Sequence, residues 1–225
     1  MSLSDEVASS GFAIVEGALS QSDCERLNRI LGEAKGAGTR DLLKVQEIAN
    51  IARGCLSDIV APLLADKPMP VRGIFFDKHP DVNWLVPWHQ DLTIAVCERH
   101  EVAGFGPWSV KDQIPHVQPP ISFLEQMVTA RLHLDDADIS NGALRVLPGS
   151  HAFGRLSADQ IRRSSECGQP LVCKVKAGDV MVMRPLLLHA SGRSLSRDHR
   201  RVVHIEYASF NLPPPLQWHD ALALQ

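Results

Sequence analysis

From residue 70 onward the chain consists of short apolar and β-branched runs separated by turn residues. These runs are VRGIFF, LVPWHQDLTIAV, MVTARLHLD, ALRVLP, LVCKVKAG, DVMVMRP and RRVVHIEYAS. No helical segment alternates with them, which argues against a parallel sheet built from βαβ units. The pattern instead predicts a β-sandwich or barrel that carries the preceding helices on its outer face.

The first part of the chain follows a helical period. The segment SQSDCERLNRILGEAKGAG carries an apolar stripe at helical spacing, and Ser22 with Glu25 matches a capping box near its start. Residues 40–66 repeat the helical period, with breaks expected at Gly54 and Pro62. We therefore expect helices over most of the chain up to about residue 66.

Length and charge favour one domain that acts on a small molecule. We expect a single domain over residues 1–225, with a helical part at 1–66 and a β core at 70–210. The 23 basic and 26 acidic side chains give a net charge of −3, and no Lys/Arg run points to a nucleic-acid partner. Five scattered cysteines and the lack of a long apolar run predict reduced thiols, no membrane partner and a cytoplasmic location.

Residues 97–127 depart from the strand series. They contain a GFGPW segment and three prolines between residues 115 and 120, so they predict a long loop. Long loops inside compact domains usually act as active-site lids, although a solvated insertion with no role is the alternative. Phe105 and Trp108 could cover a site from such a lid, or simply anchor the loop.

The run that precedes this loop contains the tripeptide His89-Gln90-Asp91. Side chains alternate along a strand, so His89 and Asp91 project to the same side, about 6 to 7 Å apart along the chain. Such a pair can bind one metal ion, although a histidine near a carboxylate is also commonly a plain hydrogen-bonded pair. Another ligand must complete a metal site.

The missing ligand lies about a hundred residues downstream, in DVMVMRPLLLHASGRSLSRDHRRVVHIEY. His189 ends a strand-like run there, and Ser191 follows on the same face. His89, Asp91 and His189 together supply two imidazoles and one carboxylate, a set that leaves three positions of an octahedral iron(II) open. A zinc hydrolase could use the same ligand types.

Arg200 distinguishes these two kinds of site. A zinc hydrolase does not need a guanidinium nearby, whereas Arg200 suits the far carboxylate of a bidentate diacid in a fork geometry. Arg201 is the rival for this role. Its neighbours on the same face, Val203, Ile205 and Tyr207, are typical packing residues, which favours Arg200.

The order of these motifs resembles that of the phytanoyl-CoA dioxygenase-like family of iron(II)- and 2-oxoglutarate-dependent oxygenases. The resemblance covers about residues 40–207 and is most specific in NGALRVLPGSH at 141–151. It implies a mostly β fold with packed helices: a double-stranded β-helix, or cupin-like jelly roll, with the N-terminal helices on its outer face.

The same resemblance implies the cofactors and their ligands. Iron(II) would be bound by His89, Asp91 and His189, and the distal carboxylate of 2-oxoglutarate by Arg200 and Ser191, with O2 as the oxidant. Halogenating members resemble this pattern but replace the carboxylate with a small residue. Asp91 keeps the carboxylate, so the resemblance favours hydroxylation.

We therefore expect a dioxygenase that hydroxylates a small organic substrate and releases succinate and CO2. Nothing in the chain looks like a dedicated coenzyme A pocket, so a phytanoyl substrate is not implied. One alternative is a cupin-like isomerase or hydrolase with a divalent metal, which would need neither Arg200 nor 2-oxoglutarate. Another is a non-catalytic binding protein on an oxygenase scaffold.

Further candidates for substrate binding carry two interpretations each. In TARLHLD, Thr129, Arg131, His133 and Asp135 share one face, so Arg131 could hold an anionic substrate group or form a structural ion pair. Lys78 and Arg72 carry the same two interpretations. The other histidines are interpreted as surface or structural residues; they are His79, His100, His116, His151, His199, His204 and His219.

Overall fold

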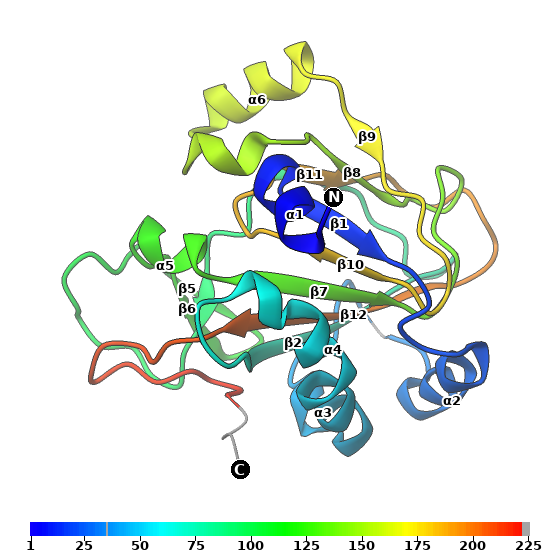
Figure 1. The fold of residues 1–225 in the computed structure, drawn as a ribbon, viewed down its shortest axis with the longest axis horizontal. Coiled ribbons are helices and arrows are strands. Elements are labelled where there is room, and N and C mark those ends of the chain that lie inside the picture. The colour runs from blue at the N-terminus through cyan, green and yellow to red at the C-terminus, as the bar shows by residue number, and fades with distance from the viewer. Residues whose placement is uncertain (35, 222–225) are drawn as a thin grey trace.

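The structure is a computed structural model that describes residues 1–34 and 36–221 (Figure 1). Its largest sheet has five antiparallel strands in the order β1-β10-β7-β12-β2. These strands are β1 (Phe12–Val15), β10 (Val180–Met183), β7 (Val128–His133), β12 (Arg200–Ala208) and β2 (Met69–Lys78).

A second antiparallel sheet has the order β3-β11-β8-β9. Its strands are β3 (Val86–His89), β11 (His189–Ser191), β8 (Leu144–Val146) and β9 (Leu171–Val172). The arrangement is a jelly roll, which confirms the predicted fold class.

The long strand β12 shows how the sheet separates two environments. It pairs with β2 along its whole length, from Arg200 opposite Lys78 to Ala208 opposite Met69. Alternate residues of β12 have opposite surroundings, because side chains of a strand alternate between faces. Val203, Ile205 and Tyr207 lie in the largest apolar core, whereas Arg200, His204 and Glu206 line a pocket.

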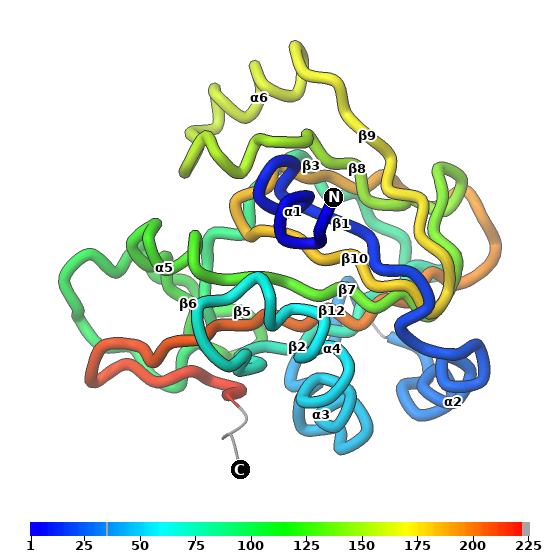
Figure 2. Tube along the Cα trace, in the orientation of Figure 1, coloured from blue at the N-terminus to red at the C-terminus, as the bar shows by residue number. Residues whose placement is uncertain are grey.

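The N-terminal helices cover the apolar face of this sheet, as the sequence predicts. They are α1 (Leu3–Ser10), α2 (Gln21–Leu31), α3 (Gln46–Arg53) and α4 (Cys55–Val60), with short 3₁₀ turns η1 (Leu42–Lys44) and η2 (Ala61–Leu63). Figure 2 shows α3 and α4 beside β2 and β12. The Tyr207 hydroxyl ties the layers together by donating a 2.9 Å hydrogen bond to the carbonyl of Ala52.

The predicted breaks and caps of these helices are partly confirmed. Gly54 separates α3 from α4, and Pro62 lies in the first turn of η2. The capping prediction for Ser22 is wrong, because α2 begins earlier. Its N-cap is Ser20, which has an extended backbone and accepts a hydrogen bond from the amide of Asp23.

Residues 97–127 are not the predicted long loop. They contain the hairpin of β5 (Trp108–Lys111) and β6 (Ile114–Val117), followed by α5 (Ile121–Glu125). With β4 (Ile94–Ala95) the hairpin forms a third sheet in the order β4-β6-β5. Its two turn residues, Asp112 and Gln113, both have positive φ, at 50° and 64°. Such turns match the twist of the flanking strands, so the hairpin tip is a defined structure.

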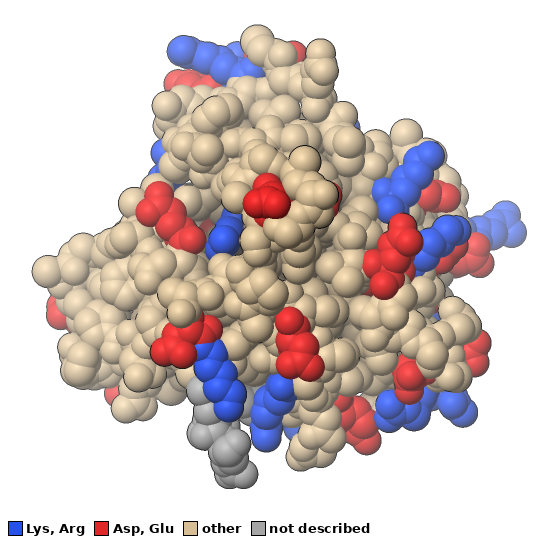
Figure 3. All heavy atoms as spheres, viewed as in Figure 1, with Lys and Arg blue, Asp and Glu red and all other residues tan. Residues whose placement is uncertain are grey.

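The remaining helical segments lie around the second sheet. They are η3 (Ser150–Phe153) and α6 (Ala158–Cys167). Among the described residues, no helix combines the length and apolarity that a membrane crossing requires. On the face seen in Figure 3, basic side chains are mixed with acidic ones. This distribution agrees with the nearly balanced charge of the sequence.

Candidate active site and metal centre

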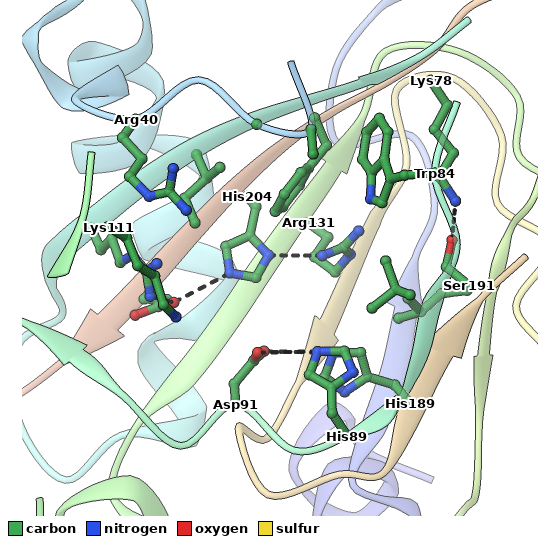
Figure 4. A pocket seen from close by; sticks show the side chains of 18 of the residues that line it. Arg40, Lys78, Trp84, His89, Asp91, Lys111, Arg131, His189, Ser191 and His204 are labelled. Carbon is green, nitrogen blue, oxygen red and sulfur yellow. Dashed lines mark hydrogen bonds and ion pairs between the residues drawn. The ribbon is translucent and has the colours of Figure 1, made fainter. Parts of the chain in front are cut away.

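A cavity of about 510 Å³ lies between the two larger sheets. Its walls come from β2, β7 and β12 on one side and from β3, β8 and β11 on the other, with the tip of the β5–β6 hairpin at one end. This volume is in the range of small-molecule sites. The cavity contains both polar clusters that the sequence singles out, and Figure 4 shows ten of its lining residues by name.

His89, Asp91 and His189 meet on one wall of this cavity. His89 and His189 are paired across β3 and β11, and Asp91 lies just beyond the end of β3, after Gln90. The Nε2 atom of His89 lies 3.6 Å from Oδ1 of Asp91, and Nε2 of His189 lies 3.7 Å from Oδ2. The ligand atoms of all three residues lie within 4.8 Å of one another. The structure thus brings together the three residues that the sequence predicts as a metal triad.

The two imidazoles are oriented by their other ring nitrogens. Nδ1 of His89 hydrogen-bonds the carbonyl of Pro87, and Nδ1 of His189 hydrogen-bonds that of Leu187, each at 2.9 Å. A carbonyl oxygen can only accept, so each Nδ1 carries the proton and each Nε2 presents its lone pair to Asp91. The Nε2 to carboxylate distances exceed those of hydrogen bonds, which argues against a plain hydrogen-bonded pair.

The charge states of the triad suit a divalent metal. Burial by itself would raise the pKa of Asp91, but the charges of His189 and His89 lower it to about 2. Burial lowers the pKa of His189 to about 4, against the opposing effect of Asp91. At neutral pH the set therefore offers an ionised carboxylate and a neutral buried imidazole. These donor types fit iron(II) or zinc.

Arg200 lies at one end of the cavity as an unpaired buried cation. It is 2% exposed, and its Nε and Nη1 atoms have no hydrogen-bond partner among the described residues. Burial, followed by the charge of Arg131, lowers its pKa to about 9. A buried cation without a partner is unfavourable, so this position favours an anionic ligand.

Lys78 and Ser191 are at the same end as Arg200. Lys78 is fully buried, and its ammonium contacts the Ser191 hydroxyl and the carbonyl of Gly192. Burial, then the charges of Arg200 and Arg131, lower the pKa of Lys78 to about 7. The structure thus places Lys78, for which the sequence left two interpretations open, beside Ser191 and Arg200.

The Asn-Gly turn at residues 141–142 supports this end of the cavity. The Ser191 hydroxyl donates to the carbonyl of Gly142 at 3.0 Å. Gly142 has a φ of +74°, and a β-carbon there would lie 2.5 Å from the carbonyl oxygen of Gly192. Only glycine allows this approach of the two chain segments.

Arg131 faces the cavity between its two ends, as Figure 4 shows. Its Nη1 lies 2.8 Å from Nδ1 of His204, while its Nε has no partner among the described residues. His204, which the sequence interprets as a surface or structural residue, lines the cavity and hydrogen-bonds Arg131. The signal was available: His204 lies on the same face of its strand as Arg200.

Arg72 forms a structural ion pair, which is one of the two roles that the sequence left open for it. It forms a buried salt bridge of 3.0 Å with Glu206, which lines the cavity beside it. Of the seven histidines interpreted as surface or structural, only His204 is among the cavity-lining residues that the structure describes. Arg40, Trp84 and Lys111 also line the cavity, although no sequence motif singled them out.

Phe105 and Trp108 do not cover the site. Phe105 is 9% exposed and packs edge-on against Phe123 in a separate apolar cluster, with ring centres 5.3 Å apart. Trp108 packs against the same cluster and lies beneath the guanidinium of Arg99. The β5–β6 hairpin borders the cavity through other residues.

A second group of metal-binding side chains lies outside the cavity. Asp41, His219 and Asp220 also bring ligand atoms within 4.8 Å. Lys44 already holds one oxygen of Asp41 at 2.9 Å, and His219 holds the other at 3.0 Å. These contacts explain the cluster without an ion.

Comparisons with known proteins concern the family and the fold of the chain. The family model described as phytanoyl-CoA dioxygenase (PhyH) matches residues 7–202. The curated protein phytanoyl-CoA dioxygenase 1 of Oryza sativa subsp. japonica is 24% identical over 160 residues, which are 67% of this chain and 48% of that protein. The chain thus spans about half the length of the curated relative that it matches.

Solved structures show the same fold. AviO1 from Streptomyces viridochromogenes Tue57 is 24% identical, covering 94% of this chain and 96% of that one, with a TM-score of 0.66. The epimerase SnoN, solved in complex with Fe3+, alpha ketoglutarate and nogalamycin RO, is 15% identical. The match covers 92% of this chain and 82% of the SnoN chain, with a TM-score of 0.68.

Proposed function

The chain belongs to the phytanoyl-CoA dioxygenase family of iron(II)- and 2-oxoglutarate-dependent oxygenases. From this premise we propose that it is a dioxygenase that hydroxylates a small organic substrate and releases succinate and CO2. The observation that carries the proposal is one cavity that combines a 2-His-1-carboxylate group with an unpaired buried arginine.

His89, Asp91 and His189 are the proposed iron ligands. Their Nε2 lone pairs and ionised carboxylate converge on one point of the cavity wall, and the backbone carbonyls behind them fix both rings. When bound, iron(II) would supply the activation of O2 at the expense of 2-oxoglutarate. The protein would contribute the positioning of the reactants and the exclusion of water.

Arg200, Lys78 and Ser191 are the proposed partners of the distal carboxylate of 2-oxoglutarate. Arg200 offers two free N–H groups, and a guanidinium can hold a carboxylate by two parallel hydrogen bonds. The Lys78 ammonium and the Ser191 hydroxyl lie beside it. Arg131, held by His204, would place its positive charge near the triad, where the other carboxylate of the diacid belongs.

Hydroxylation is the part of the proposal that depends on substrate geometry. Asp91 supplies a carboxylate, so the site lacks the open ligand position of halogenating relatives. SnoN, which has the same fold, is an epimerase, so the fold by itself does not select hydroxylation. A substrate must be identified before its product can be examined for one added oxygen atom.

Two measurements separate this function from its alternatives. We expect the anaerobic iron(II) protein to bind 2-oxoglutarate with a metal-to-ligand charge-transfer absorption, and to form succinate when air is admitted. A cupin-like hydrolase or isomerase would bind metal but form no succinate, and a binding protein would show neither signal. Absence of both the absorption and succinate in metal-loaded protein would refute the proposal. A metabolite screen for stimulated succinate formation would then identify substrates.

A further inference from the structure

The cavity has two ends that differ in their charged groups. In Figure 4, Lys78, Trp84 and Ser191 lie at one end and Arg40 and Lys111 at the other, with the triad on the wall between them. Arg200, whose Nε and Nη1 have no partner among the described residues, lies at the first end. This end is the proposed binding place of the distal carboxylate of 2-oxoglutarate. The second end is therefore the one that the substrate can occupy.

Arginines at the second end are neutralised by carboxylates. Arg40 forms a salt bridge with Asp112, which joins the segment after α2 to the hairpin tip. Arg72 forms its 3.0 Å salt bridge with Glu206. Both carboxylates that line this end are thus already engaged by arginines.

Lys111 at the same end has no such partner. Its closest polar contact is the hydroxyl of Thr93, 3.4 Å from the ammonium, and no carboxylate of the described residues lies within salt-bridge distance. Partial burial, then the charges of Arg72 and Arg40, lower the pKa of Lys111, against the opposing charges of Asp91 and Glu206, although the side chain remains in contact with solvent. An anion placed there would relieve this repulsion.

The hairpin holds Lys111 in this place. Lys111 ends β5 opposite Ile114, directly before the turn at Asp112 and Gln113. Asp112 forms a salt bridge with Arg40, in the segment after α2. The paired backbone and the neighbouring salt bridge fix where the Lys111 side chain begins, while the side chain itself is exposed where it borders the cavity.

We propose that the substrate is a small organic acid whose carboxylate binds Lys111, so that the rest of the molecule extends toward the triad. The inference rests on the proposed function, because that assigns the opposite end to 2-oxoglutarate. One unpaired positive charge matches one carboxylate, rather than a phosphate dianion. The volume of about 510 Å³ must also hold 2-oxoglutarate, which favours a compact acid.

Matched pairs of small carboxylic acids and their primary amides test this inference, beginning with benzoate and benzamide and with cyclohexanecarboxylate and its amide. Binding is measured by saturation-transfer NMR on full-length protein loaded with redox-inert zinc and 2-oxoglutarate. We expect acids to bind about tenfold or more tightly than their amides. Lys111→Gln should remove this preference, and Lys111→Arg should keep it. Lys67→Gln, at an exposed lysine outside the cavity, is the matched control and should behave as wild type.

The outcomes separate this inference from the proposed function. Wild-type protein that binds 2-oxoglutarate but prefers no acid over its amide overturns the inference alone, as does a preference that survives in Lys111→Gln. Failure of the metal-loaded wild type to bind 2-oxoglutarate overturns both. Lys111→Gln should bind 2-oxoglutarate with wild-type affinity, which shows that the variant is folded.

Discussion

Arg201 holds Asp135 with two parallel hydrogen bonds of 2.8 Å, from its Nε and Nη2 atoms. The adjacent Arg200 lines the cavity and has two nitrogens without a partner among the described residues. Neighbouring residues of a strand face opposite sides, so β12 directs the guanidinium of Arg201 to Asp135 and that of Arg200 to the cavity.

We expect Arg200→Ala to weaken 2-oxoglutarate binding by two orders of magnitude or more, while metal binding stays nearly intact. Loss of one partner of a buried charge pair costs about 3 to 5 kcal/mol. Arg200→Lys should recover only part of the loss, because an ammonium keeps the charge but not the fork. Titration of 2-oxoglutarate into the anaerobic iron complex measures the effect.

Arg201→Ala is the matched control for this prediction. It should leave 2-oxoglutarate affinity nearly unchanged and lower the stability of the fold instead, because Asp135 loses its partner. A larger loss of 2-oxoglutarate affinity in Arg201→Ala than in Arg200→Ala would contradict the assignment of the two faces.

We predict that His89→Ala, Asp91→Ala and His189→Ala each lose metal binding. Two ligands cannot hold a labile divalent ion tightly. Metal at a hundred times its dissociation constant stabilises a protein by about 2.7 kcal/mol, so the wild type should gain thermal stability with metal and the variants should not. His219→Ala, in the second cluster, should retain the full gain. Wild-type metal affinity in any of the three triad variants would refute the triad.

Binding of 2-oxoglutarate should be coupled to protonation of Lys78. Burial and neighbouring cations lower its pKa from 10.5 to about 7, so Lys78 is mostly neutral at pH 8 in the free protein. A bound carboxylate raises that pKa, so binding at pH 8 takes up protons. Calorimetry in two buffers of different ionisation enthalpy measures this uptake. Equal uptake in wild type and Lys78→Met would disprove the coupling.

Lys78 also gives the stability of the unliganded protein a defined pH dependence. Its pKa is lower in the folded state than in the unfolded state, so the unfolded state binds more protons between about pH 7 and 10.5. The penalty of burying Lys78 is therefore complete below pH 7 and decreases as pH rises through this window. Lys78→Met should be more stable than wild type at pH 7, with a difference that shrinks toward pH 10 in denaturant titrations.

Gly142→Ala should destabilise the fold and weaken 2-oxoglutarate binding together. Alanine is strained at a φ of +74°, and its β-carbon would push the Gly192 carbonyl away from Lys78. Strain of this kind costs about 1 to 3 kcal/mol. Gly192→Ala is the control, because a β-carbon there meets nothing within 4 Å. Equal behaviour of the two variants in denaturant and 2-oxoglutarate titrations would contradict this role of the turn.

The strands and the triad could be predicted because their signals are local or depend on residue type. RRVVHIEYAS shows the alternation of β12 directly, whereas Asp91 lies beyond the end of β3 and still comes close to His89. His189 lies beside His89 because β11 pairs with β3, and a chain made of successive strands allows such a pairing between distant segments. Arg200 was favoured over Arg201 by the apolar residues on the same face as Arg201, and the structure places Arg200 at the cavity and Arg201 against Asp135.

Other features depend on contacts that no local pattern reveals. The salt bridge of Arg72 joins it to Glu206, 134 positions away along the chain. The run VRGIFF alone therefore could not show that the charge of Arg72 is neutralised. The β5–β6 hairpin has Asp112-Gln113 at its turn instead of an Asn-Gly or Asp-Gly signal, and Pro115 lies within a strand. These residues obscured the hairpin and therefore the position of Lys111.

The division of β12 into two faces also separates stability from specificity. Val203, Ile205 and Tyr207 connect the strand to the helical layer, while every second position between them borders the ligand cavity. A library that varies only Glu206 and its partner Arg72 would change the shape and charge of the cavity without altering those connections or the contact of Arg131 with His204. New substrate preferences can thus be sought in this scaffold by substitutions at one cavity-facing residue of a single strand and its salt-bridge partner.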